Sequence, residues 1–329
     1  MTILITGATS AVGYFIAEKV RAQYPKAEIK ALSRSGKKVK ELDELGISII
    51  KGDLTDSNSL DKALKGIDTV YNAAGEARDY IPSRLYYEVN VDGTRNLLES
   101  FVKNKGKRFL HISTVGIYGY KPKNQPIKET HPKNPDHPYH ETKMIAENLV
   151  FEYAKEHDFF ASAVRPPYIV GPKDRQVAPL IFDYLLKRKK IPLVGGGKAV
   201  VAFVHHKDVA EALVRCGEVD KANGEAFHVI GGTSTARRLF EMAGEISNKE
   251  PIFQEISYPL AFVAAIASET MAKIKGTKPK ISRRRVNQFS RTRVYSTDKI
   301  KEILGFVPKY DVRAAFQDAF DWMKEQKLV

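Results

Sequence analysis

The sequence predicts a doubly wound α/β fold, in which a parallel sheet carries helices on both faces. Its 329 residues are 43% hydrophobic and 28% charged, a composition typical of globular domains rather than of disordered, collagen-like or coiled-coil chains. In the first third of the chain, short apolar segments alternate with segments whose apolar residues recur every three or four positions. Short apolar strands separated by amphipathic helices are typical of a parallel sheet that is covered on both sides.

Each element of this alternation can be given a range. Strands are expected at residues 2–6, 29–33, 48–50, 69–72 and 109–113. Helices are expected at residues 11–23, 37–45, 57–65 and 83–103, with a further helix from residue 139 to about residue 156. After residue 165 the alternation weakens and pairs of proline or glycine appear. A smaller lobe is therefore expected over the carboxyl edge of the sheet, where such folds bind ligands.

A glycine-containing turn joins the first strand to the first helix. Residues 6–13 read Thr-Gly-Ala-Thr-Ser-Ala-Val-Gly, and glycine allows both unusual φ values and a close backbone approach to a ligand. The helix that follows presents its N-terminus to phosphate. This order of strand, turn and helix predicts a dinucleotide site with contacts from Gly7, Thr9, Ser10, Ala11, Val12 and Gly13. Residues 1–165 are expected to form a Rossmann-type dinucleotide-binding domain with returning elements near residues 203–232, and residues 166–329 mainly a partly interleaved substrate-binding lobe.

A second group of residues predicts acid–base chemistry. Tyr139 and Lys143 lie four positions apart at the start of a predicted helix, so they share one helix face. A phenol titrates near pH ~10 and needs a neighbouring cation to act near neutrality, which Lys143 can supply. Ser113 and Thr114 end the fifth predicted strand, at the edge where a reacting carbonyl would lie. A surface pair is the alternative, but the preceding dinucleotide turn favours a catalytic one.

With these motifs the chain resembles the extended short-chain dehydrogenases/reductases, also described as the NAD-dependent epimerase/dehydratase family. Further matching residues are Gly52, Asp53, Leu54, Asn72, Ala73, Ala74, Asn90, Tyr118, Gly119, Arg165, Pro166 and Pro167. The resemblance implies that Tyr139 is the acid/base and that Lys143 tunes it and binds the nicotinamide ribose. It implies that Thr114 orients the substrate carbonyl, with Ser113 as the less favoured candidate. It also implies that Asp53 and Leu54 flank the adenine, and that the cofactor site includes Asn72, Ala73, Ala74, Asn90 and Pro166.

Two positions depart from the family pattern. Ser10 stands where the family has glycine, so a β-carbon would crowd the phosphate turn while its hydroxyl could donate a hydrogen bond. The second predicted strand ends in Ser33 and Arg34, where NAD-dependent relatives carry an acid for the ribose diol. A cation and hydroxyls suit a 2′-phosphate, so NADP(H) is favoured over NAD(H) as the cofactor. The alternative is that Arg34 faces solvent.

The residues around the site favour one chemistry of the family over others. Dehydratases of this family carry Asp-Glu after the catalytic threonine, where this chain has Val115 and Gly116. Nucleotide-sugar epimerases usually place an asparagine and an arginine where this chain has Tyr168 and Val201. The chain therefore resembles most the 3β-hydroxysteroid dehydrogenase and dihydroflavonol reductase branch, which interconverts secondary alcohols and ketones. The expected substrate is hydrophobic, and is sterol-, lipid- or flavonoid-like. A nucleotide-sugar epimerase and a non-catalytic NAD(P)-binding sensor remain as alternatives.

The charge distribution is uneven. The net charge is +14, and residues 270–297 hold nine lysines and arginines but no acid. The segment before it, residues 258–274, is largely apolar but too short to span a bilayer. Such a helix could line an apolar substrate entrance or rest on an anionic membrane surface. The alternative is an ordinary core helix of the smaller lobe.

The remaining features concern partners and compartment. The single cysteine, Cys216, excludes an internal disulfide, and no signal peptide is evident, so a cytoplasmic protein with optional peripheral membrane contact is expected. No nucleic-acid partner is expected, because only Phe289 and Tyr295 interleave the basic run as stacking aromatics. No metal is expected, because His205 and His206 would point to opposite faces of a strand. A homodimer is expected through the helices near residues 97–102 and 145–153.

Overall fold

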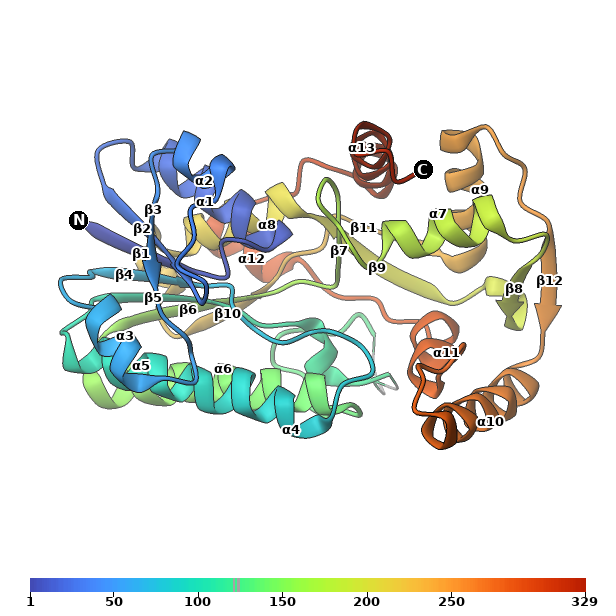
Figure 1. Ribbon diagram of the computed structural model, residues 1–329, viewed down its shortest axis with the longest axis horizontal. Helices are drawn as coiled ribbons and strands as arrows, with labels where there is room; N and C mark the ends of the chain where they lie inside the picture. The colour runs from blue at the N-terminus through green and yellow to red at the C-terminus, as the bar shows by residue number, and fades with distance from the viewer. Residues whose placement is uncertain (121, 123–124) are drawn as a thin grey trace.

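The computed structural model describes residues 1–120, 122 and 125–329, and its main feature is a seven-stranded sheet (Figure 1). The strand order is β3-β2-β1-β4-β5-β6-β10, and every neighbouring pair is parallel. The strands are β1 (Thr2–Thr6), β2 (Glu28–Ser33), β3 (Ser48–Lys51), β4 (Thr69–Asn72), β5 (Arg108–Ile112), β6 (Phe160–Arg165) and β10 (Glu225–His228). The predicted doubly wound parallel sheet is confirmed.

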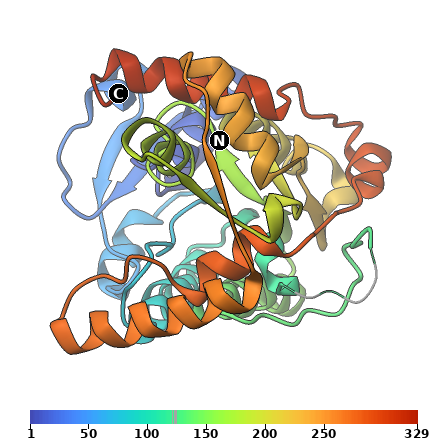
Figure 2. The same cartoon turned by 90° about the vertical axis from the view of Figure 1, so that its right-hand side faces the viewer.

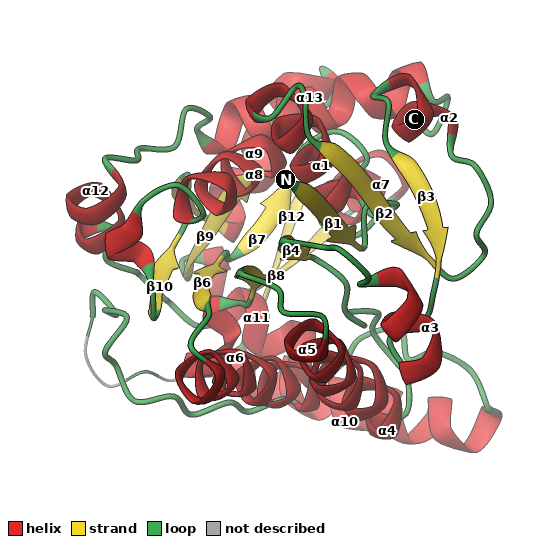
Figure 3. Cartoon of the chain, turned by 90° about the vertical axis from the view of Figure 1, so that its left-hand side faces the viewer, coloured by secondary structure: helices red, strands yellow, loops and turns green. Residues whose placement is uncertain are grey.

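Helices cover both faces of this sheet (Figures 1 and 3). One face carries α1 (Ala11–Gln23), α2 (Lys40–Glu44), α8 (His206–Cys216) and α12 (Asp298–Leu304). The other carries α3 (Ser57–Ala63), α5 (Gly93–Lys103) and α6 (Pro138–His157). Each helix layer buries its own apolar cluster, around Phe15 and Leu213 on the first face and around Phe101 and Val150 on the second. Burial of apolar surface on both sides explains why the strands are apolar without alternation.

The helical segment predicted over residues 83–103 is continuous but not uniform. It consists of α4 (Ser83–Tyr86), the π-helical η1 (Tyr87–Asp92) and α5. Single π-helical turns within α-helices often occur at functional sites. Here the wider turn carries Asn90, which is buried beneath the site described below.

The smaller lobe has its own sheets and core. Strand β9 (Val200–His205) lies between β7 (Tyr168–Val170) and β11 (Gly232–Thr235), while β8 (Ile191–Val194) pairs with β12 (Phe253–Ile256). Phe182, Phe316 and Phe320 centre its core, between the helices α7 (Ala178–Lys187), α9 (Ala236–Ser247) and α13 (Val312–Glu325). The chain then adds α10 (Tyr258–Lys275) and α11 (Arg283–Ser290) at the outer edge. Short 3-10 turns lie at η2 (Val115–Tyr118), η3 (Gly195–Gly197) and η4 (Asp220–Ala222).

Two expectations about this half are wrong. His205 and His206 do not share a strand, because β9 ends at His205 and His206 begins α8. The alternative of an ordinary core helix is also wrong, because α10 buries only Ala261, Ala265 and Ala272 and exposes Leu260, Val263, Ile266, Met271 and Ile274. In the part of the chain that the structure describes, no helix is long and apolar enough to cross a membrane.

Candidate active site

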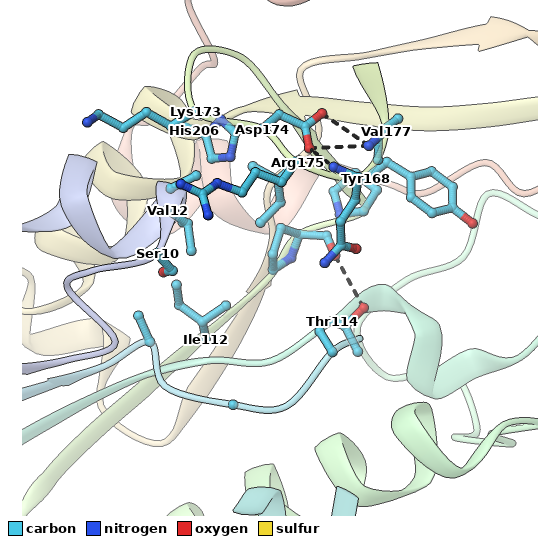
Figure 4. A pocket seen from close by; sticks show the side chains of 18 of the residues that line it. Ser10, Val12, Ile112, Thr114, Tyr168, Lys173, Asp174, Arg175, Val177 and His206 are labelled. Atoms are coloured by element: carbon cyan, nitrogen blue, oxygen red, sulfur yellow. Dashed lines mark hydrogen bonds between the residues drawn. The ribbon is translucent and has the colours of Figure 1, made fainter. Parts of the chain in front are cut away.

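A cavity of about 1030 Å³ opens at the carboxyl ends of β1, β4 and β5. The strand order reverses between β1 and β4, and doubly wound sheets bind their ligands at such a point. Ser10, Val12 and Ile112 lie toward one end of the cavity, and Thr114 and Tyr168 toward the other (Figure 4). One continuous space therefore joins the glycine turn to the predicted catalytic residues.

The glycine turn is shaped by two glycines and a serine. Gly7 has a φ of +69°, and a β-carbon on Gly13 would collide with the Gly7 carbonyl. Ser10 has an ordinary φ of −84° and is the N-cap of α1. Its hydroxyl donates to the Gly7 carbonyl (2.8 Å) and accepts from the Gly13 amide (3.1 Å). The serine that departs from the family pattern thus fixes the turn and caps the helix.

The end of β2 carries the residues that are predicted to favour NADP(H) over NAD(H). Arg34 is exposed, lines the cavity and makes no salt bridge with the residues that the structure describes. Ser33 lies beside it and contacts the Ser35 hydroxyl (3.3 Å). Asp53 and Leu54 follow β3 but do not line the cavity, and the Asp53 carboxylate accepts from Thr55. Of the predicted cofactor residues around the glycine turn, Thr9, Ser10, Ala11 and Val12 line the cavity, while Gly7 and Gly13 lie behind it.

A row of buried polar groups runs from β1 to the catalytic helix. The Thr6 hydroxyl donates to Asn72 Oδ1 (2.7 Å), Asn72 Nδ2 contacts His111 Nδ1 (3.2 Å), and His111 Nε2 contacts Lys143 Nζ (3.3 Å). Burial and the nearby Lys143 charge lower the pKa of His111 well below its usual value, so the imidazole is neutral and accepts a hydrogen bond at one of its two ring nitrogens. Asn72 does not line the cavity itself but is connected to it through His111 and Lys143. Its neighbours Ala73 and Ala74 line the cavity directly.

Asn90 also supports the site from behind. Its Oδ1 accepts from the Glu76 amide (2.7 Å), and its Nδ2 contacts the Glu76 carbonyl and the Thr142 hydroxyl (3.1 Å each). These bonds join the loop after β4 to α6, next to Lys143. Asn90 itself belongs to the π-helical turn η1.

Tyr139, Lys143 and Glu147 follow one face of α6 at steps of four residues. Tyr139 and Lys143 line the cavity, and Pro166 faces them from the end of β6. Burial lowers the pKa of Lys143 to about 8, although the Glu147 carboxylate partly opposes this. Burial of Glu147 opposes its ionisation, but the hydrogen bonds and charges of Arg165 and Lys133 outweigh burial and lower its pKa to about 2.

The Tyr139 phenol has an unexpected neighbour. Burial raises its pKa, and the cation that opposes this shift is Arg284, whose guanidinium lies 5.8 Å from the Tyr139 ring centre. Arg284 and Arg293 both line the cavity. The sequence placed them only in an acid-free basic segment, 145 and 154 residues after Tyr139, so nothing local assigned them to the site.

The two candidate hydroxyls for the carbonyl occupy adjacent positions after β5. The Thr114 side chain accepts from the Gly116 amide (3.1 Å) and contacts the Pro166 carbonyl (3.5 Å), so Thr114 starts η2 (Figure 4). The Ser113 hydroxyl is buried and finds no partner within the described residues. Both residues line the cavity.

The residues present fit a nicotinamide dinucleotide. The Gly7 turn and the start of α1 would hold its diphosphate, Arg34 would lie beside the adenosine, and Tyr139 and Lys143 would lie beside the nicotinamide. Within residues 1–120, 122 and 125–329, no group of three His, Cys, Asp or Glu side chains is placed to hold a metal ion. The fold and the site thus define a class of nicotinamide-dependent enzymes.

Comparisons with known proteins agree with this class. Residues 3–230 match the model of the NAD dependent epimerase/dehydratase family, so the chain belongs to that family and is an enzyme of the extended short-chain type. The chain is 29% identical over 314 residues to N-acetyl-α-D-glucosaminyl-diphospho-ditrans,octacis-undecaprenol 4-epimerase of Escherichia coli O157:H7 (94% of this chain, 91% of the relative). It is 27% identical over 347 residues to sterol-4-α-carboxylate 3-dehydrogenase of Candida albicans (98% of each). The crystal structure of gox2253 matches with a TM-score of 0.83 and 26% identity, over 99% of this chain and 98% of that one.

Proposed function

We propose that this enzyme interconverts a secondary alcohol and a ketone on a hydrophobic substrate, with NADP(H) as the favoured cofactor. The observation that supports the proposal is the cavity itself, which is lined by Tyr139, Lys143 and Thr114 and also by Arg34. Tyr168 and Val201 line the same space. These aromatic and aliphatic side chains favour an apolar substrate body over a sugar nucleotide.

The residues divide the chemistry between them. A bound nicotinamide would supply the hydride acceptor or donor. Thr114 would hydrogen-bond the substrate oxygen and orient it toward the Tyr139 hydroxyl, which gives up or takes the proton of that oxygen. Lys143 and Arg284 would stabilise the phenolate with their positive charges, against the burial that raises the pKa of Tyr139.

The names of the relatives support an amphiphilic substrate. One relative acts, by its name, on a sterol carboxylate and the other on a sugar joined through a diphosphate to a polyprenol. Both are lipids that carry an anionic group. The epimerase relative supports epimerisation of a lipid-linked sugar as an alternative function of this chain.

A stoichiometry experiment separates the two functions. The enzyme is incubated with excess NADP⁺ and a 3β-hydroxysterol 4-carboxylate, and reduced nicotinamide is measured together with the ketone. We expect reduced cofactor to accumulate in proportion to the substrate consumed, and faster with NADP⁺ than with NAD⁺. Conversion of a polyprenyl-diphospho-sugar to its 4-epimer, with no net change in the cofactor pool, would overturn the proposal in favour of the epimerase.

A further inference from the structure

We propose that Arg284 and Arg293 form a binding site for an anionic group of the substrate, a carboxylate or a phosphate. This inference rests on the proposed function and specifies the substrate class of the same cavity. The two arginines come from the basic segment near the end of the chain, and both reach the cavity wall beside the catalytic helix.

Arg293 is a buried cation that pairs with no acid among the residues that the structure describes. Its side chain is 5% exposed, its Nη2 donates to the Gln288 carbonyl (2.9 Å), and its guanidinium lies 5.0 Å from the Tyr120 ring centre. Within residues 1–120, 122 and 125–329 no carboxylate forms a salt bridge with it. The three other residues of the chain are two lysines and an asparagine, so they cannot supply one. A buried charge is costly unless it is paired, so this position favours an anion from outside the chain.

Arg284 is only partly neutralised. One of its Nη atoms pairs with Asp79, but the same carboxylate also lies 3.6 Å from Arg285. The Arg284 Nε is buried and has no hydrogen-bond partner among the described residues. One acid therefore serves two guanidinium groups, so the positive charge of Arg284 is only partly neutralised where this residue lines the cavity.

The two arginines converge on one region of the cavity. Burial lowers the pKa of His140, and both Arg284 and Arg293 add to this effect, whereas Asp136 (3.5 Å from His140 Nδ1) opposes it. His140 neighbours Tyr139 on α6, with the two ring centres 5.6 Å apart. An anion held by both guanidinium groups would therefore lie next to the reacting carbon, on the substrate side of the cavity. Planar guanidinium groups match carboxylate and phosphate oxygens in pairs.

The test uses matched ligand pairs on the NADP⁺-loaded enzyme. Binding is measured by calorimetry for a 3β-hydroxysterol with and without a 4-carboxylate, and for farnesyl diphosphate against farnesol. We expect one anionic member to bind about 10- to 100-fold more tightly than its neutral partner, in line with charge-assisted hydrogen bonds. The pair that shows the preference identifies carboxylate or phosphate as the anion. Equal affinity within both pairs would overturn the inference.

Variants locate the site. Arg293→Gln and Arg284→Gln should each remove most of the preference for the anion, and Arg293→Lys should restore part of it while keeping the charge. Arg283→Gln is the matched control, because Arg283 belongs to the same segment but pairs at the surface with Glu269 (2.7 Å). An unchanged preference in both Gln variants would contradict the inference. Since binding is measured here and net cofactor reduction in the test of function, either proposal can fail without the other.

A separate observation concerns the outer face of α10, which lies along the outside of the molecule beyond α11 (Figures 1 and 2). The residues of this face are all exposed and apolar, and their spacing forms one stripe along the helix: Leu260, Val263, Ala264, Ala267, Met271 and Ile274. Leu260 is 63% and Ile274 75% exposed, while the opposite face packs through Ala261 and Ala265 onto α11. An exposed apolar stripe of this kind marks an interaction surface.

Exposed cations sit at the end of this stripe. Lys273, Lys275, Lys278 and Lys280 are exposed, and none forms a salt bridge with the described part of the chain. The arginines of the same segment behave differently, since Arg283, Arg284 and Arg285 pair with acids. We infer that α10 docks on a membrane surface that contains anionic lipid. Its apolar side chains complement the hydrocarbon region, and its unpaired lysines complement the anionic headgroups. Helix α11, which carries Arg284, would then connect this surface to the cavity.

Vesicle flotation tests the docking face. We expect binding to vesicles of phosphatidylcholine with phosphatidylglycerol, weaker binding to phosphatidylcholine alone, and release by ~0.5 M salt, which shortens the Debye length to well under 10 Å. Ile274→Glu should reduce binding several-fold, whereas Val307→Glu, at another exposed apolar position (60% exposed, against 75% for Ile274), should not. No binding to the anionic vesicles would overturn the inference. A dimer in solution that Ile274→Glu dissociates would also overturn it, in favour of a second copy of the chain.

Discussion

Lys143 makes the chemistry sensitive to alkaline pH. Burial lowers its pKa to about 8, so the ammonium that we propose to assist Tyr139 is lost as the pH rises through about 8. We therefore expect the rate of ketone reduction to fall as the pH rises through about 8, which gives the pH profile an alkaline limb. Lys143→Met should reduce turnover and cofactor affinity at every pH and should abolish the limb. A rate that stays constant up to pH 10 would contradict this role.

The same shift has an opposite effect on stability. Because the folded pKa of Lys143 lies below its ordinary value of 10.5, the unfolded chain binds more protons between about pH 8 and 10.5. The contribution of Lys143 to the free energy of unfolding should therefore rise across this window. Urea unfolding of the parent and of Lys143→Met at several pH values isolates this contribution as the difference between the two.

Arg34 is expected to select the cofactor. Arg34→Asp should weaken NADPH binding by about one to two decades, because it removes a charge-assisted contact with the 2′-phosphate and adds repulsion. NADH affinity should change little or improve. The single tryptophan, Trp322, lines the same cavity, so its fluorescence can report cofactor binding. Equal affinities of the parent enzyme for NADH and NADPH would exclude this role.

At the scale of the elements, Ser10 couples the glycine turn to α1. Its hydroxyl bonds on both sides of the turn, so Ser10→Ala should cost about 1 kcal/mol of unfolding free energy, whereas Ser10→Gly should cost only a few tenths. Denaturant titration measures both. The family glycine at this position would thus be tolerated for stability. A larger loss in Ser10→Gly than in Ser10→Ala would show that Ser10 is not acting as the cap.

Helix α6 depends on a buried ion pair at its centre. Glu147 bonds Arg165 through both oxygens (2.6 and 2.8 Å) and is completely buried. Glu147→Gln should destabilise the fold by about 3–5 kcal/mol, because it leaves a buried guanidinium without its partner. Glu156→Gln, at an exposed position of the same helix, is the control. Since the pKa of Glu147 is about 2, its contribution should persist to low pH and be lost as the pH falls from 4.5 through 2.

At the scale of the whole molecule, the sequence predicted the first half better than the second. Strands over residues 2–112 follow from apolar runs between amphipathic helices, and their parallel arrangement is confirmed by the pairing of β1 with β2 and β4. Tyr139 and Lys143, which line the cavity, could be predicted to lie together because their spacing on one helix is local. Arg284 and Arg293 were not, because only the folded chain brings them to the cavity. Sequence pattern also could not show that α10 is apolar on its exposed face.

A single measurement on Tyr139→Phe tests most directly whether this cavity carries out hydride transfer. Single-turnover oxidation of a bound alcohol is compared in the parent and the variant, while Trp322 fluorescence reports cofactor affinity in each. We predict that the variant loses at least ~10²-fold in rate and keeps its cofactor affinity, because only the proton-transferring hydroxyl is removed. Full hydride transfer by Tyr139→Phe would contradict the assignment of Tyr139 as the acid/base.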